Sequence, residues 1–143
     1  MPPPTHKLSR QQRAVLLDVY TRYVAQAALE AQYPHAGTQL PAWGASWYTD
    51  TDRSGQASLS RSLRRLEARG LVLRRNQYRG GPRTTHVKLL PDGLALLQAT
   101  GAVGPEVPEA VHQAVATTLA ELDARAAALM ATLGPRGHAT RNG

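Results

Sequence analysis

The sequence predicts a mainly α fold with one small β-hairpin, an α+β class in which a long helix closes the chain. Apolar residues recur at helical spacing in the first quarter of the chain and again near its end. Two apolar runs flank the stretch RGGP, which is typical of a hairpin. The length of 143 residues suits one domain with an appended helix.

A first helix is predicted from Ser9 to Tyr33. Ser9 followed by Gln12 is the pattern of a capping box, in which each side chain bonds the other residue's backbone amide. The apolar residues that follow keep helical spacing until the pair Tyr33 and Pro34 ends the pattern. They are Leu16, Val19, Tyr20, Tyr23 and Ala27.

The next stretch, PHAGTQLPAWGASWY, predicts a short second helix with Thr38 as its cap. We expect this helix to contain Leu40, Trp43 and Trp47. Pro41 is compatible with it because a proline in the first turn removes no helical hydrogen bond.

A third helix is predicted over 55–69, ending at Gly70. Its leucines, Leu59, Leu63 and Leu66, share one stripe and are expected to face the core. The opposite side holds residues 57, 61, 64, 65 and 68. Three of these five are arginines, so we expect the arginines to point away from the core together.

The hairpin comes next, with strands over 71–78 and 83–90 joined by RGGP. We expect Leu71 and Leu73 to face Val87 and Leu89 across it. A short helix follows Pro91, and the stretch TGAVGPEVP breaks the chain before the last helix.

The last helix is predicted from Glu109 to Leu133, with an apolar stripe along its length. The stripe residues are Val111, Val115, Leu119, Leu122, Ala126, Leu129 and Leu133. Its outer half would expose leucine to water unless the first helix of the same chain or a second copy of this helix covered it. We therefore place a domain at 8–100, a C-terminal dimerisation helix at 105–134 and a disordered tail at 135–143.

The positive charge is concentrated in one segment. Residues 53–88 hold ten of the chain's 17 bases and only one acid, Glu67, whereas residues 1–52 are neutral and residues 89–143 are slightly acidic. A codon bias toward arginine would explain the choice of arginine over lysine, but it would explain neither this crowding nor the lack of acids. The pattern favours a face that binds a polyanion.

Three helices and a two-stranded hairpin are the element order of a winged helix-turn-helix, and residues 38–98 resemble MarR-type regulators. The resemblance rests on SLSRSLRRLEARGLVLRR, GGPRTTHVKLL and PDGLALL, which look like the recognition helix, the wing and the helix after it. Gly81 and Leu90 stand where that family commonly has Asp and Thr. A domain followed by one long terminal helix is more similar to PadR-type regulators. The resemblance implies a homodimer, and we expect it to repress transcription from a pseudo-palindromic operator.

The major groove of B-DNA admits one α-helix, whose outward side chains face base edges and phosphates. Arg61 and Arg65, with Gln56 and Ser58, are our candidates for reading bases, because arginine bonds guanine in bidentate fashion and serine bonds several bases. Phosphate contacts are expected from Arg53, Arg64 and Arg74. Insertion into a narrow minor groove would suit Arg79 and Arg83. The full set of candidate DNA-binding residues is Arg53, Gln56, Ser58, Ser60, Arg61, Arg64, Arg65, Arg74, Arg79 and Arg83.

Other chemistry has little support. The chain has no cysteine, and its five histidines are scattered without metal-binding spacing, so we expect no metal, no cofactor and no enzyme activity. No apolar run has the length of a membrane span, and the start MPPPTHK lacks a signal sequence, so we expect a cytoplasmic protein.

Three alternatives stay open. The aromatic residues of the first two helices are expected to form core, or else a pocket for a small-molecule effector between the first helix and the last. The DNA-binding domain could serve a replication-initiation or nucleoid-associated protein with weak sequence preference. It could also bind only protein, although the charged segment argues against that.

Overall fold

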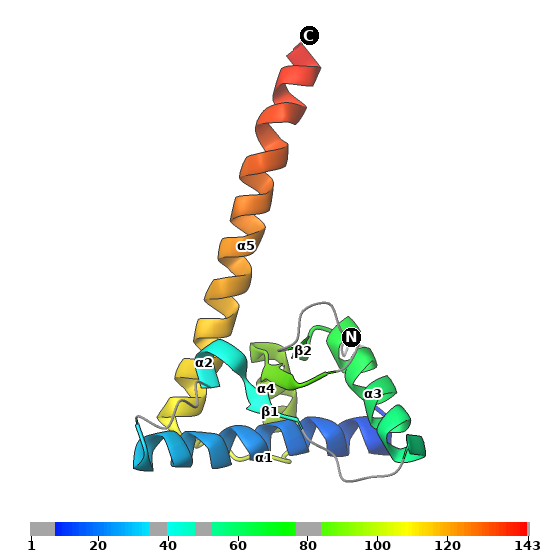
Figure 1. Ribbon diagram of the computed structural model, residues 1–143, viewed down its shortest axis with the longest axis vertical. Helices are drawn as coiled ribbons and strands as arrows, with labels where there is room; N and C mark the ends of the chain where they lie inside the picture. Colours follow the sequence, from blue (N-terminus) through cyan, green and yellow to red (C-terminus); the bar gives the residue numbers. More distant parts are fainter. Residues whose placement is uncertain (1–7, 35–39, 48–52, 77–83, 143) are drawn as a thin grey trace.

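Helices make up most of the computed structural model, which describes residues 8–34, 40–47, 53–76 and 84–142 (Figure 1). In chain order the elements are α1 (Arg10–Gln32), α2 (Leu40–Trp43), β1 (Ala45–Ser46), α3 (Arg53–Ala68), β2 (Val72–Arg75), β3 (His86–Leu89), α4 (Pro91–Ala99) and α5 (Glu109–Asn142). The predicted class, mainly helical with an antiparallel hairpin and a long C-terminal helix, is confirmed.

The start of α1 is fixed by the predicted capping box. The Gln12 amide donates to the Ser9 hydroxyl over 3.1 Å, and the Ser9 amide donates to the Gln12 side chain over 3.2 Å. The buried side of α1 follows helical spacing and includes Leu16, Val19 and Tyr23. This helix lies across the base of the molecule in Figure 1, with α3 near its N-terminal end.

The second helix is shorter than predicted. It ends at Trp43, because Gly44 takes a left-handed conformation with φ of 85° that glycine adopts at little cost. A Cβ at Gly44 would also overlap the Val87 carbonyl. Trp47 therefore lies outside the helix, buried just after β1, and its inclusion in the helix was wrong. The amide of Leu40 is bonded by the Glu30 carboxylate at 2.7 Å, and the predicted cap, Thr38, lies outside the described residues.

Among the described residues, the strands form one sheet in the order β1-β3-β2, with both pairs antiparallel. Val72 lies opposite Leu89, and Leu73 lies opposite Lys88, so the predicted facing of Leu71 and Leu73 with Val87 and Leu89 was off by one residue. The reason is that the Leu71 amide bonds the Leu66 carbonyl and still belongs to the turn after α3. The strand consequently begins at Val72.

The five helices and the three strands that the structure describes all contribute residues to the core. The helix α2 contributes Leu40, and α5 contributes only residues from its base. One polar link crosses this core: the Leu89 amide donates to the Tyr23 hydroxyl over 2.6 Å. Burial raises the pKa of Tyr23 far above its ordinary value, so the phenol is uncharged and serves only as a hydrogen-bonding group. We call the part formed by α1 to α4 and the sheet the head.

The last helix leaves the head and continues as a single rod (Figure 1). The pattern predicted an end at Leu133 and a disordered tail at 135–143, whereas the helical backbone runs to Asn142. The helix therefore continues through Gly134 and Pro135, two residue types that are unfavourable within a helix and that had suggested its end. In the described part of the chain, no helix combines the length and the hydropathy required to cross a membrane.

Candidate nucleic-acid interface

The third helix separates apolar and basic side chains as predicted. Leu63 and Leu66 are buried in the core, and Leu59 is half-buried against it. The residues assigned to the opposite side are all exposed. They are Ala57, Arg61, Arg64, Arg65 and Ala68. The helix therefore carries its arginines on its solvent side and its leucines toward α1 and the sheet.

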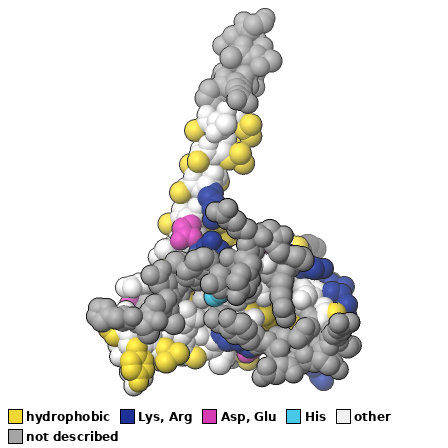
Figure 2. Space-filling view, viewed as in Figure 1, with side chains coloured by type: hydrophobic (Ala, Val, Ile, Leu, Met, Phe, Trp, Pro, Cys, Tyr) yellow, Lys and Arg dark blue, Asp and Glu magenta, His cyan; other side chains and the backbone are white. Residues whose placement is uncertain are grey.

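The three arginines on this face have no protein partner among the described residues: neither an ion pair nor a hydrogen bond joins Arg61, Arg64 or Arg65 to the rest of the chain. We call these three the α3 arginines. In Figure 2, dark-blue side chains gather on the side of the molecule where α3 lies in Figure 1. Each guanidinium keeps five N–H donors directed at water or at a ligand. Such a face can bind a polyanion without first breaking internal ion pairs.

The serines of α3 are less accessible than the arginines. Ser58 and Ser60 are half-buried. The Gln11 side-chain amide donates to the Ser58 hydroxyl over 2.6 Å, so this hydroxyl already accepts one bond and retains its own O–H as a donor. Gln11 comes from the start of α1, a partner that nothing in the sequence pattern indicated. Ser58 can still donate to a ligand, but its position is partly set by α1.

Four of the predicted DNA-binding side chains cannot be placed. Arg79 and Arg83 lie outside the described residues. Arg53 and Gln56 lie in the helical backbone of α3, whose first side chains fall outside the described part as well.

Arg74 differs from the α3 arginines because it has an internal partner. Its backbone amide donates to Glu67 Oε2 over 2.8 Å, and its Nε donates to Glu67 Oε1 over 3.0 Å. The pair joins the last turn of α3 to β2, and both side chains are partly buried. Glu67, the one acid of the basic segment, bonds Arg74 through Nε, and the expectation that Arg74 contacts phosphate stays a prediction.

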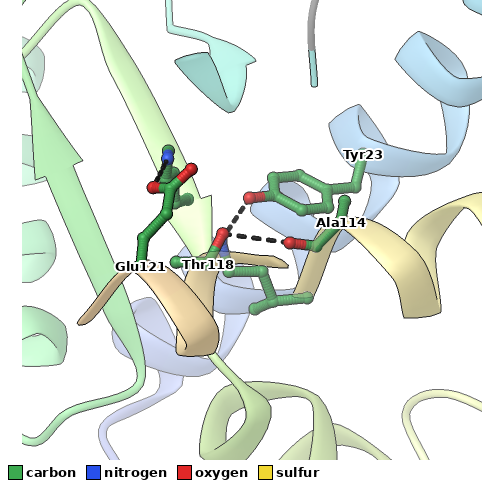
Figure 3. Close-up of polar contacts among 6 residues, drawn as sticks. Tyr23, Ala114, Thr118 and Glu121 are labelled. Carbon is green, nitrogen blue, oxygen red and sulfur yellow. Dashed lines mark hydrogen bonds and ion pairs between the residues drawn. The ribbon is translucent and has the colours of Figure 1, made fainter. Parts of the chain in front are cut away.

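Lys88 differs from the α3 arginines both in its burial and in its partner. It lies on the middle strand, its side chain is fully buried, and its ammonium group bonds Glu121 of α5 over 2.8 Å (Figure 3). The bond from Lys88 holds the pKa of the Glu121 carboxyl below its ordinary value, with Arg75 and Arg125 acting in the same direction. Lys88 counts toward the charge of the sequence segment, but it contributes nothing to a ligand-facing surface.

The paired residues of β2 and β3 that come closest in sequence to the gap at 77–83 are Arg75 and His86. Arg75 lies opposite His86, and the His86 ring is 3.0 Å from the Thr85 hydroxyl. Burial lowers the pKa of His86, and Arg75 lowers it further, so this histidine is neutral near pH 7. It adds no charge to the hairpin.

The stripe predicted for dimerisation divides into two parts. Val111 and Val115 are buried in the head, together with Ala114 and Thr118, so we correct their assignment to a dimer interface. Beyond the head, Leu119, Leu129 and Leu133 are exposed to 44%, 59% and 53% of their surface, Ala126 is exposed, and Leu122 is half-buried. Met130, at 67%, adds to this surface and was missed because it lies beside the stripe. Figure 2 shows the yellow side chains along this part of α5.

This exposed surface bears on the alternative that α1 covers the outer half of α5. In the structure α1 packs only near the base of α5, and the outer leucines stay exposed. The described chain therefore leaves an apolar stripe on α5 without an internal partner.

Most of the aromatic side chains that the structure describes fill the core, whereas Tyr33 is exposed. Tyr23 and Trp47 are buried, Tyr20 packs against the core, and Arg22 lies 4.5 Å from the centre of the Trp47 ring. A cavity of about 180 Å³ lies instead between α1 and α4. Its lining includes Leu16, Leu17, Leu96, Leu97 and Arg13, and none of the aromatic residues named above.

Comparisons of the chain with protein-family models, with curated proteins and with solved structures gave no match.

Proposed function

We propose that this chain is a cytoplasmic, homodimeric winged helix-turn-helix protein that binds double-stranded DNA in a sequence-specific way and represses transcription by occupying a pseudo-palindromic operator. In this proposal α3 is the recognition helix, the β2–β3 hairpin is the wing, and the outer half of α5 is the dimerisation surface.

The observation that carries the proposal is the solvent face of α3. Three guanidinium groups lie on one side of a helix whose other side is core, and none of them has a partner in the described chain. Arginine supplies both bidentate contacts to guanine O6 and N7 and charge for phosphates, and a helix of this kind fits the major groove. A helix that served only as a structural surface would gain nothing from three adjacent cations, since like charges on neighbouring turns repel.

The proposed roles follow from spacing along the helix. Arg61 and Arg65 are four residues apart and lie one above the other, so both can face the same groove and read bases. Arg64 lies beside them and would contact a phosphate at the edge of the groove. Arg74 stays a proposed phosphate contact, with its Nε already bonded to Glu67.

The dimer follows from the apolar stripe of α5. Leu129, Met130 and Leu133 would be covered if two copies paired about a two-fold axis, which is the commonest symmetry of soluble homo-oligomers. Two recognition helices would then contact half-sites about one DNA turn, roughly 34 Å, apart.

The experiment that tests this function is selection of bound duplexes from a random pool, followed by affinity measurement for the selected and for unrelated sequences. The proposal expects an inverted repeat and a ratio of specific to non-specific affinity of at least about 10³. A pool without a shared motif, bound at one common affinity, would instead indicate a nucleoid-type protein. Absence of duplex binding at low salt would reject both.

A further inference from the structure

The point at which α5 leaves the head is marked by a change in burial. Along the base of α5, Val111, Ala114, Val115 and Thr118 are buried at spacings that keep one helix face against the core. Glu121 is the next position on the same face and is half-buried, and every described residue from Asp123 on is exposed. Glu121 is therefore among the last residues of α5 that touch the head.

The polar bond that joins α5 to the head at this point comes from Lys88. Its side chain has no exposed surface, and its Nζ lies 2.8 Å from Glu121 Oε2 (Figure 3). An ammonium group taken out of water is stable only beside an opposite charge, and the attraction is strong where water is excluded. The middle strand therefore holds one side of α5 at a fixed distance.

The other contacts at the base of α5 are less directional. The Thr118 hydroxyl donates to Ala114 within α5 itself and does not link α5 to the head (Figure 3). Val111, Ala114 and Val115 make apolar contacts with the core, and apolar contacts fix burial more strongly than direction. Arg75 on β2 and Arg125 on α5 are near enough to influence Glu121, but the hydrogen bond comes from Lys88.

We propose that the Lys88–Glu121 ion pair sets the direction in which α5 leaves the head, and thereby sets the spacing of operator half-sites that the dimer accepts. Glu121 and Lys88 are thus positioning residues that do not touch DNA. Leu133 lies 12 residues beyond Glu121, about 18 Å along the helix, so a small change of angle at Glu121 moves the dimer surface by several ångströms. The claim about spacing rests on the proposed function, whereas the claim about direction does not.

The direction of α5 can be measured in the full chain. The sequence has no cysteine, so Ala95→Cys on α4 and Ala131→Cys on α5, both at exposed positions, accept spin labels without further changes. Mixing labelled chains with excess unlabelled chains makes the distance within one chain the quantity that electron-spin resonance reports. Ala131 also lies on the side of α5 opposite Leu129 and Leu133, away from the proposed dimer surface.

The test variant is Lys88→Met with Glu121→Gln, which removes both charges and leaves no unpaired ammonium in the core. We expect it to fold, as judged by circular dichroism, and to show a broadened or shifted distance distribution. Arg125→Gln is the matched control, since it removes a nearby cation that makes no hydrogen bond to Glu121 in the described chain, and it should retain the wild-type distribution. A wild-type distribution in the double variant would overturn the proposal. If the double variant does not fold, the distance distribution is measured in Glu121→Gln alone. A wild-type distribution in that variant would likewise overturn the proposal.

A second measurement tests the link to DNA. Operators whose half-sites are moved apart or together by one base pair should be discriminated by the wild-type protein and by Arg125→Gln, and the double variant should lose this discrimination. Unchanged discrimination despite an altered distance distribution would overturn the role in spacing. If the wild-type protein bound no duplex, the proposed function would fail, and the distance measurement would still decide the role of the ion pair in directing α5.

Discussion

Two regions of the basic segment use their positive charge in opposite ways. On the outer face of α3, Arg61, Arg64 and Arg65 are exposed and have no partner in the described chain. On the sheet, Arg74 is held by Glu67, and Lys88 is buried against Glu121. The first region is available to a ligand, and the second contributes to the internal structure. Charge counted along a sequence therefore overstates the charge that a partner can meet.

The difference arises from the secondary structure on which each base lies. A helix packed along one side leaves more than half of its circumference in water, so bases opposite the leucines stay solvated. A middle strand is covered on both faces, and all four residues of β3 are buried. A base on such a strand requires an acid from another element, which α5 supplies to Lys88.

The largest effect expected from the exposed region is the salt dependence of DNA binding. A dimer that neutralises on the order of 6 to 10 phosphates should lose roughly 10³ to 10⁵ in affinity between 50 and 200 mM salt. A filter-binding titration with the selected duplex measures the slope. A flat response would mean that the exposed arginines do not meet phosphate.

The next effect concerns the outer half of α5. Leu129→Asp with Leu133→Asp places charge on the exposed stripe and should give a folded monomer, because neither side chain belongs to the core. Affinity for the complete operator should fall by about 10² to 10⁴, since two linked heads gain that much over one. Light scattering reports the mass, and Ala127→Asp, one position from the stripe, tests whether added charge alone suffices.

The buried region should respond through stability. Glu121→Ala leaves the Lys88 ammonium without a counter-charge and should lower the free energy of unfolding by about 3 kcal/mol, the lower end for a broken buried pair because Glu121 is partly exposed. Arg64→Ala, on the exposed face, should change it by less than about 0.5 kcal/mol. Urea unfolding followed by circular dichroism measures both. Equal effects would contradict the distinction between the two regions.

The Lys88–Glu121 ion pair also predicts a pH dependence of stability. The pKa of Glu121 is lowered in the folded state, so its stabilising contribution is complete above the ordinary carboxyl pKa of 4.5 and is lost as pH falls through the folded value. The lowered pKa of His86 also reduces the stability of the folded state as pH falls below about 6.5. The free energy of unfolding should therefore change less between pH 7 and pH 3.5 in Glu121→Gln than in the wild-type protein. A larger change in the variant than in the wild-type protein would contradict a stabilising contribution from ionised Glu121.

Within the exposed region, the arginines should differ from one another. Arg61→Ala or Arg65→Ala should cost about 1 to 3 kcal/mol of binding and relax the preference at one operator position. Arg64→Ala should weaken all sequences alike. Repeating the duplex selection with each variant separates the two outcomes, and an unchanged motif for both Arg61→Ala and Arg65→Ala would remove their assignment to bases.

Local patterns predicted the elements that depend on local chemistry. The capping box at Ser9, the end of α3 near Gly70 and the exposed face of α3 are all determined by neighbours along the chain. Partners distant in sequence were not predictable. The bond from Gln11 to Ser58, the burial of Lys88 and its pairing with Glu121, 33 residues away, depend on how the elements pack. The strand β1 was missed because two residues after a glycine carry no alternating pattern.

The most direct test compares the two regions in one binding experiment. The wild-type protein, a variant with Arg61→Gln, Arg64→Gln and Arg65→Gln, and the variant with Lys88→Met and Glu121→Gln are titrated with a selected half-site duplex at low salt. A half-site requires no particular spacing, so the sheet variant should bind it as the wild-type protein does. The variant of α3 should lose measurable binding while remaining folded. Binding of the α3 variant at wild-type affinity would contradict the claim that this face of α3 contacts DNA.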